Sequence, residues 1–225
     1  MKHGQSLADV FNKFMEKQSK VFGYDFHSFS LDGQDRDAGA DYLLSDSNRF
    51  AIIEFKFSED ELPSENKKPR RLNLCKKLPL YPTMTIHHDK CHFITFSNST
   101  TGVIYTNVYR KQICNKSIFG DSCGLNDQSP NISSLCTANV FANSFFNGQG
   151  SHSLSFNDFV DYLAWLLNDV SGSSSSTLEV LVINPDSKDL AVTTMSSIEL
   201  LHNYIKDNIR PSTQEATPKK RGPRP

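Results

Sequence analysis

Residues 40–57 read ADYLLSDSNRFAIIEFKF, and this stretch decides the fold of the chain. Its two apolar runs, 42–45 and 49–57, are separated by a short polar segment, which is typical of two strands joined in a β-hairpin. The second run is apolar on both faces, as a central strand must be when helices cover both sides of a sheet. The stretch therefore predicts a hairpin whose second strand lies in the middle of the fold.

The register of this hairpin follows from the length of its turn. A two-residue turn at 47–48 suits the asparagine there, because Asn tolerates the positive φ that tight hairpin turns require. Asp46 then pairs with Arg49, and counting back along the ladder places Asp41 opposite Glu54. Opposed residues have Cβ atoms about 5 Å apart, which is close enough for two carboxylates to share one divalent cation.

Lys56 follows Glu54 by two residues and is therefore expected on the same face of the strand. Two carboxylates and an ammonium on an apolar sheet are costly to bury, because like charges repel and a lone lysine loses its hydration. A Mg²⁺ or Mn²⁺ ion held by Asp41 and Glu54 removes this conflict, and it lowers the pKa of a bound water. Lys56 would orient that water or stabilise the charge that develops on phosphorus. The trio thus predicts a metal-dependent centre for phosphodiester hydrolysis.

The elements around the hairpin predict an α/β fold with a central mixed β-sheet of about five strands flanked by helices. Pro69 must interrupt or delay the second of the expected helices. The periodicity predicts helices at 6–22, 64–78, 156–167 and 196–208, and strands at 24–31, 91–97, 102–110 and 178–186.

The length of 225 residues favours one hydrophobic core, so we expect a single domain over residues 1–210. Residues 114–152 are rich in Ser, Asn and Gly with little periodicity, and we interpret them as a long loop or insertion. Residues 211–225 end in PKKRGPRP and are expected to form a disordered basic tail, which either binds nucleic acid or merely solubilises the chain.

Composition excludes several classes of protein. No stretch approaches the roughly 18 consecutive apolar residues of a membrane helix, and the N-terminus lacks the apolar core of a signal peptide. The five cysteines are an odd number without a CxxC pair, which favours the reducing cytoplasm over a disulfide framework or a zinc ribbon. Motifs of serine hydrolases, P-loop ATPases and dinucleotide enzymes are absent from the sequence.

The net charge of −1 hides a local excess of basic residues after the hairpin. Such a cluster either contacts the phosphates of a nucleic acid or forms a solvated helix face, and the charges alone leave both readings open. The nucleic-acid-binding candidates are Lys67, Lys68, Arg70, Arg71, Lys76 and Lys77.

The dipeptide Ala40-Asp41 followed by Glu54-Phe55-Lys56 resembles the motif of the PD-(D/E)xK nuclease superfamily, with Ala in place of the usual Pro. The order of helices and strands over residues 6–97 is also similar to the core of that family, so the resemblance implies a restriction-endonuclease-like fold. We find no Gln-containing motif on the helix that follows, which leaves exonuclease subtypes without support.

The resemblance further implies an acidic residue from the first helix near the metal, for which Glu16 is the candidate and Asp9 the reserve. We hypothesise that the carbonyl of Phe55 completes the metal shell. The resemblance implies that the basic helix faces nucleic acid, with DNA favoured over RNA. It also implies a role in defence against foreign DNA or in repair, either as a homodimer or with partner subunits.

Two alternatives to a nuclease stay open, and one of them is an α/β interaction protein of another fold that uses its long 114–152 loop. A non-catalytic protein of the same fold would keep the charged trio as a structural ion pair and act as a nucleic-acid-binding or protein-interaction module. The run from His87 to His92 is the densest group of metal-ligand types, but we interpret it as a polar turn that enters a strand, since no second ligand group follows at a recognisable spacing.

Overall fold

A computed structural model describes residues 3–31, 38–46, 48–147, 152–172, 180–183 and 192–208. The basic tail expected at 211–225 lies outside the described residues, as does Ser47 of the predicted hairpin turn.

The central sheet has seven strands, two more than expected, in the order β1-β2-β3-β4-β5-β6, with β7 paired to the start of β3. β3 and β4 are parallel, and the other pairs are antiparallel. The fold is therefore α/β with a mixed central sheet, as the sequence predicts. The strands of this sheet are β1 His27–Ser30, β2 Tyr42–Ser45, β3 Arg49–Ser58, β4 His92–Ser97, β5 Ile104–Val108, β6 Cys136–Thr137 and β7 Leu154–Ser155.

The β2–β3 hairpin has the register that its sequence predicts. Cα partners run from Ser45 and Phe50 to Tyr42 and Ile53, and the N–H of Asp46 donates to the carbonyl of the residue at position 49 over 3.2 Å. The short turn fixes this register, because β3 is buried on both faces and its apolar pattern alone would not distinguish a shift by one residue.

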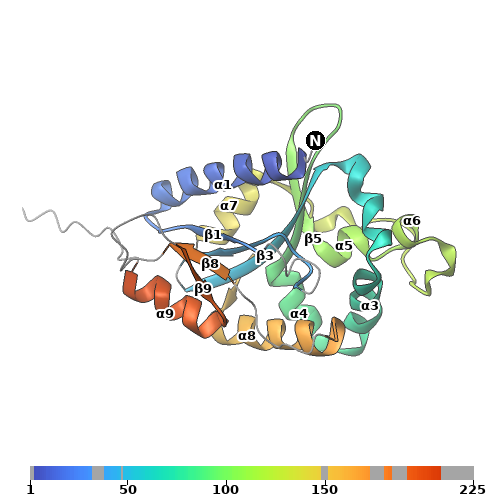
Figure 1. The fold of residues 1–225 in the computed structure, drawn as a ribbon. Coiled ribbons are helices and arrows are strands. Elements are labelled where there is room, and N and C mark those ends of the chain that lie inside the picture. Colours follow the sequence, from blue (N-terminus) through green and yellow to red (C-terminus); the bar gives the residue numbers. More distant parts are fainter. Residues whose placement is uncertain are drawn as a thin grey trace, which may run out of the picture.

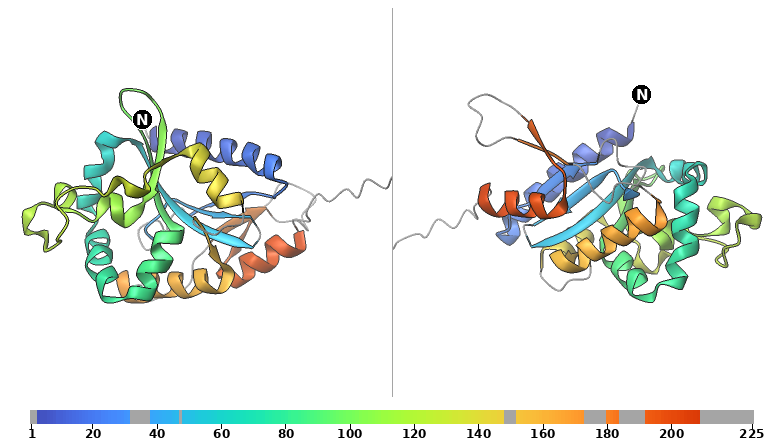
Figure 2. Two further views of the ribbon diagram at one scale, coloured as in Figure 1. Left: turned by 180° about the vertical axis from the view of Figure 1, so that it is seen from behind. Right: turned by 60° about the horizontal axis from the view of Figure 1, so that its bottom comes forward.

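Helices cover both faces of the sheet (Figure 1). α1 His3–Phe22 and α7 Ala138–Phe146 lie on one side, and α4 Pro82–Cys91 and α8 Phe156–Trp165 lie on the other, as the two views of Figure 2 also show. The remaining elements are η1 Glu59–Lys67, α3 Pro69–Lys77, η2 Leu78–Leu80, α5 Tyr109–Ile113, α6 Lys116–Phe119, η3 Asp121–Cys123, η4 Ile132–Ser134, η5 Leu166–Val170, β8 Val180–Ile183, β9 Val192–Met195 and α9 Ile198–Asn208.

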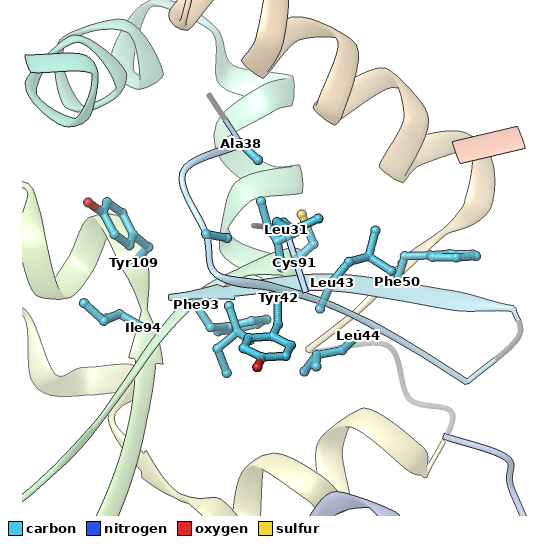
Figure 3. Packing of buried hydrophobic residues seen from close by; sticks show 14 of the residues in the cluster. Leu31, Ala38, Tyr42, Leu43, Leu44, Phe50, Cys91, Phe93, Ile94 and Tyr109 are labelled. Atoms are coloured by element: carbon cyan, nitrogen blue, oxygen red, sulfur yellow. The ribbon is translucent and has the colours of Figure 1, made fainter. Parts of the chain in front are cut away.

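Side chains of β3 alternate between these two layers. The ring of Phe55 lies 5.4 Å from that of Phe11 in α1, whereas the ring of Phe50 lies 5.5 Å from that of Phe159 in α8. Figure 3 shows Leu43 on the same side of the sheet as Phe50. Even-numbered residues of β3 therefore face the α4 and α8 layer, and odd-numbered residues face α1.

The structure corrects the interpretation of residues 114–152 as a long loop. This segment contains short helices and α7, in which Phe141 and Phe145 are completely buried. The apolar residues of α7 do recur at helical spacing, but the Ser- and Asn-rich composition of the whole segment led to the prediction of a loop. The sequence also missed α4, which precedes β4, and the helix expected at 64–78 is divided at Pro69, which begins α3.

Two further findings concern cross-links and membrane-spanning helices. The expectation from the sequence that the cysteines form no disulfide framework is wrong for one pair, because Cys75 and Cys114 form a disulfide that ties α3 to the start of the 114–152 segment. In the part of the chain that the structure describes, no helix has the length and apolar character needed to cross a membrane.

Candidate functional site

Asp41 lies at the end of the loop that enters β2 and is held there by three hydrogen bonds. Its N–H donates to Ile53 O over 2.9 Å, its carbonyl accepts the N–H of Leu31 over 2.8 Å, and its Oδ2 accepts the N–H of Phe55 over 2.6 Å. Asp41 therefore contacts the residues on either side of Glu54. Burial, and then the charge of Glu54, raise the pKa of Asp41 to about 7.

Glu54 projects from β3 toward the layer that contains α3 and is only 1% exposed. Its Oε1 lies 3.0 Å from Nζ of Lys56 and 2.6 Å from Nζ of Lys68, and its Oε2 lies 3.4 Å from Nη2 of Arg71. The structure thus brings Glu54 and Lys56 together on one face, as predicted, and adds two cations from the basic segment.

Glu65 is the principal residue of this site that sequence reasoning missed. It is fully buried near the end of η1, and its Oε1 lies 2.6 Å from Nζ of Lys56 and 2.9 Å from Nζ of Lys68. Its Oε2 lies 3.3 Å from Nε of Arg71 and accepts the hydroxyl of Tyr109 over 2.5 Å. No local pattern distinguishes Glu65 from Glu61, which is exposed in the same helix, so only the tertiary structure reveals its role.

These residues form an ion network in which the carboxylates of Glu54 and Glu65 contact three cations, and the carboxylate of Asp41 lies on the neighbouring strand end. Burial alone would lower the pKa of Lys56, but Glu54 and Glu65 outweigh it and raise that pKa. Burial likewise favours the protonated form of Glu65, but Lys56 and the other cations hold its pKa below the usual range. Lys56 is therefore a protonated ammonium that forms ion pairs with both Glu54 and Glu65.

The three cationic side chains of the network differ strongly in their exposure to solvent. The side chain of Lys68 is 36% exposed, whereas those of Lys56 and Arg71 are 10% and 3% exposed. Of the three cations, Lys68 is therefore the one whose ammonium can leave its carboxylates for solvent at the lowest cost.

The basic segment is divided between the network and the surface. Lys68 and Arg71 point to the carboxylates, whereas Lys67 and Lys76 are exposed. Arg70 and Lys77 are half-buried. Only part of the predicted nucleic-acid-binding set thus presents its charge to solvent.

Glu16 and Asp9 are exposed on α1. Because α1 packs on Phe55, it covers the face of the sheet opposite to Glu54 and Lys56. The structure does not bring the acidic candidates of α1 to the network, although the resemblance implies one there.

The histidines at the end of α4 and the start of β4 are core residues. His88 and His92 are fully buried, and Nδ1 of each lies 2.7 Å from the hydroxyl of Tyr162 in α8. Burial lowers the pKa of both rings, that of His92 to about 3. This run lies on a helix rather than in the polar turn expected, and no three His, Cys, Asp or Glu side chains converge as a metal site within the described ranges.

The donor set of Asp41, Glu54 and Phe55 nevertheless fits a divalent cation that keeps several water ligands. Asp41 and Glu54 raise each other's energy when both are ionised, which a cation would reverse. Phe55 directs its N–H to Asp41, and in a strand the carbonyl of the same residue points to the same side. A cation bound to Glu54 would have to replace the Lys68 ammonium.

Comparisons of the chain with protein-family models, with curated proteins and with solved structures found no match.

Proposed function

We propose that this chain is a divalent-metal-dependent nuclease that hydrolyses phosphodiester bonds, with DNA as the favoured substrate. The observation that carries the proposal is the placement of Asp41 beside Glu54, through hydrogen bonds to the residues before and after it, with Lys56 on the same face as Glu54. This is the arrangement that the resemblance to PD-(D/E)xK nucleases implies for a cutting centre.

In this proposal Asp41, Glu54 and the Phe55 carbonyl hold Mg²⁺ or Mn²⁺. The bound ion supplies a water of lowered pKa and offsets the charge of the phosphate. The raised pKa of Lys56 keeps its ammonium protonated, so this residue acts as a hydrogen-bond donor to a phosphoryl oxygen or to the attacking water, not as a base. Glu65, whose Oε1 lies 2.6 Å from Nζ of Lys56, orients this ammonium together with Glu54.

Charge around the site supports an anionic substrate. Once a divalent cation replaces the Lys68 ammonium beside the three carboxylates, Lys56 and Arg71, the site carries a net charge of about +1, which favours a phosphodiester. Lys67 and Lys76 lie exposed on the same segment as Lys68 and would add salt-dependent contacts with the backbone of the nucleic acid. A cytoplasmic role in defence against foreign DNA or in repair, as a homodimer or with partner subunits, is part of the proposal.

A second candidate function is a non-catalytic binding or interaction module. One observation favours it: with Asp41 ionised, the three carboxylates and three cations balance without any added ion. In this case Lys56 and Lys68 would be permanent structural partners of Glu54.

The direct test is incubation of the purified protein with linear duplex DNA, circular duplex DNA, single-stranded DNA and RNA, each in Mg²⁺, Mn²⁺ or EDTA. We expect cutting of DNA that requires the metal. Binding of DNA without cutting in any metal would support the second candidate function instead.

A further inference from the structure

A buried chain of hydrogen bonds connects α5 to the loop that carries Asp41. The N–H of Arg110 donates to Nε2 of His88 over 3.1 Å, and Nδ1 of His88 lies 2.7 Å from the Tyr162 hydroxyl. The same hydroxyl lies 2.7 Å from Nδ1 of His92, whose Nε2 lies 3.0 Å from the carbonyl of Gly39. Gly39 precedes Asp41 by two residues.

The groups at the two ends of this series of hydrogen bonds determine where each of its protons lies. A backbone N–H can only donate, so Nε2 of His88 accepts, and a neutral His88 must carry its proton on Nδ1. A carbonyl can only accept, so His92 donates from Nε2 and its Nδ1 accepts. The Tyr162 hydroxyl therefore accepts from His88 and donates to His92, and burial of both rings keeps them neutral.

The contact with His92 requires a glycine at position 39. Its φ is +78°, and a Cβ there would lie 2.9 Å from Nη1 of Arg71 and 3.1 Å from Cε1 of His92. A side chain at this position would therefore both strain the backbone and push the His92 ring away. The loop approaches the core as closely as a residue without a side chain allows.

His92 is also placed to couple the loop to the ion network. Its ring lies 4.8 Å from that of Tyr109, whose hydroxyl donates to Glu65, the partner of Lys56. As the first residue of β4, His92 is paired in register with Ile52 of β3, so its backbone is anchored in the sheet that carries Glu54.

We propose that His92 is a positioning residue of the candidate site: its Nε2–H holds the Gly39 carbonyl, and with it Asp41, against the sheet, while Tyr162 and His88 fix the tautomer that makes this donation. This inference rests on the proposed function for its catalytic meaning. Partners that orient metal ligands from behind change metal affinity by about 10- to 100-fold when they are removed.

Two substitutions at His92 separate positioning from packing. The amide nitrogen of Gln reaches the place of Nε2, whereas that of Asn ends near the place of Nδ1. His92→Gln therefore keeps a donor for Gly39, and His92→Asn loses it. Both variants lose the imidazole ring, so a purely structural role would lower the melting temperature and change every other property of both alike.

Hydrogen exchange of the backbone amides of residues 40–42 is the first readout, since it needs no metal. We expect about tenfold faster exchange in His92→Asn than in the wild type, with His92→Gln close to the wild type. Mn²⁺ titration is the second readout, and we expect about tenfold weaker binding in His92→Asn only. If His92→Asn does not fold, Tyr162→Phe is the substitute, because it keeps the His92 imidazole and removes only the hydroxyl that donates to it. We expect faster exchange and weaker Mn²⁺ binding in this variant too, by smaller factors.

Equal exchange at 40–42 in the wild type and both variants would overturn the positioning role of His92. Failure of the wild type to bind Mn²⁺ would count against the proposed function instead, and the exchange data would still decide whether His92 holds the loop. Equal Mn²⁺ affinity in all three proteins would show that the loop contact does not serve the metal site.

Discussion

Nζ of Lys68 lies 2.6 Å from Oε1 of Glu54, closer than either other cation that contacts this carboxylate in the described structure. Lys68 also contacts Glu65 over 2.9 Å, and its side chain is 36% exposed. An ammonium that bridges two carboxylates and can withdraw to solvent stands where a divalent cation would bind Glu54. Lys68 should therefore compete with the metal.

Lys68→Met should tighten Mn²⁺ binding. The half-exposed ion pair contributes roughly 1 kcal/mol, so its removal should lower the dissociation constant about fivefold. Titration calorimetry measures the change, and Lys67→Met, which removes an exposed charge one residue away, serves as the matched control. An unchanged constant in Lys68→Met would mean that the metal does not displace this ammonium.

Glu65→Gln should destabilise the protein by about 3–5 kcal/mol, because it removes a partner of the buried cations Lys56 and Arg71 and of the partly exposed Lys68. Urea unfolding measures the loss. Glu61→Gln, which changes an exposed residue of the same helix, is the control, and a change within about 0.5 kcal/mol is expected for it. Similar stabilities of the two variants would contradict the role of Glu65 as the centre of the network.

Acid should destabilise the protein through His92. Burial lowers its pKa from 6.5 to about 3, so its contribution to stability is present above pH 6.5 and is lost as the pH falls from there toward 3. One such group changes the free energy of unfolding by up to about 1.4 kcal/mol per pH unit. Urea unfolding at pH 7 and pH 4.5 should show a smaller loss in His92→Gln than in the wild type, and equal losses would argue against a neutral buried ring.

Asp41 should have the opposite pH dependence. Its pKa is raised from 3.8 to about 7, so its contribution to stability is present below pH 4 and is lost as the pH rises through 7. At pH 8 in EDTA, Asp41→Asn should therefore melt at a higher temperature than the wild type. Mn²⁺ should then stabilise the wild type and not the variant, whereas equal stabilisation of both would place the metal elsewhere.

How far the sequence predicts this fold depends on the range of the interactions. The apolar run of β3 and the short turn before it are local features, and the length of the turn predicts the register that brings Asp41 to Glu54. α7 was missed because its apolar residues, including Phe141 and Phe145, span only nine residues inside a long segment rich in Ser and Asn, and its packing against the sheet stabilises so short a helix.

The site was predictable to the same extent. Lys56 follows Glu54 by two residues, so strand geometry alone places both on one face. Glu65 reaches Lys56, and Tyr109 reaches Glu65, only through the way η1 and α5 pack, and nothing in their neighbouring residues indicates these contacts. Glu16 was instead expected at the site and lies on the other side of the sheet. A helical pattern does not say which face of the sheet its helix will cover.

The measurement that tests the central claim most directly is the rate of DNA cleavage in Mn²⁺ by the wild type, Asp41→Asn and Lys56→Met. Asp158→Asn and Lys90→Ala, which change exposed residues of the same types, serve as controls, and circular dichroism confirms that each variant is folded. We predict cleavage by the wild type and both controls, abolition by EDTA, and a loss of at least about 100-fold in Asp41→Asn and Lys56→Met. Cleavage that survives in both folded site variants, or a folded wild type that cuts neither DNA nor RNA in any metal, would contradict the assignment of a nuclease centre to Asp41, Glu54 and Lys56.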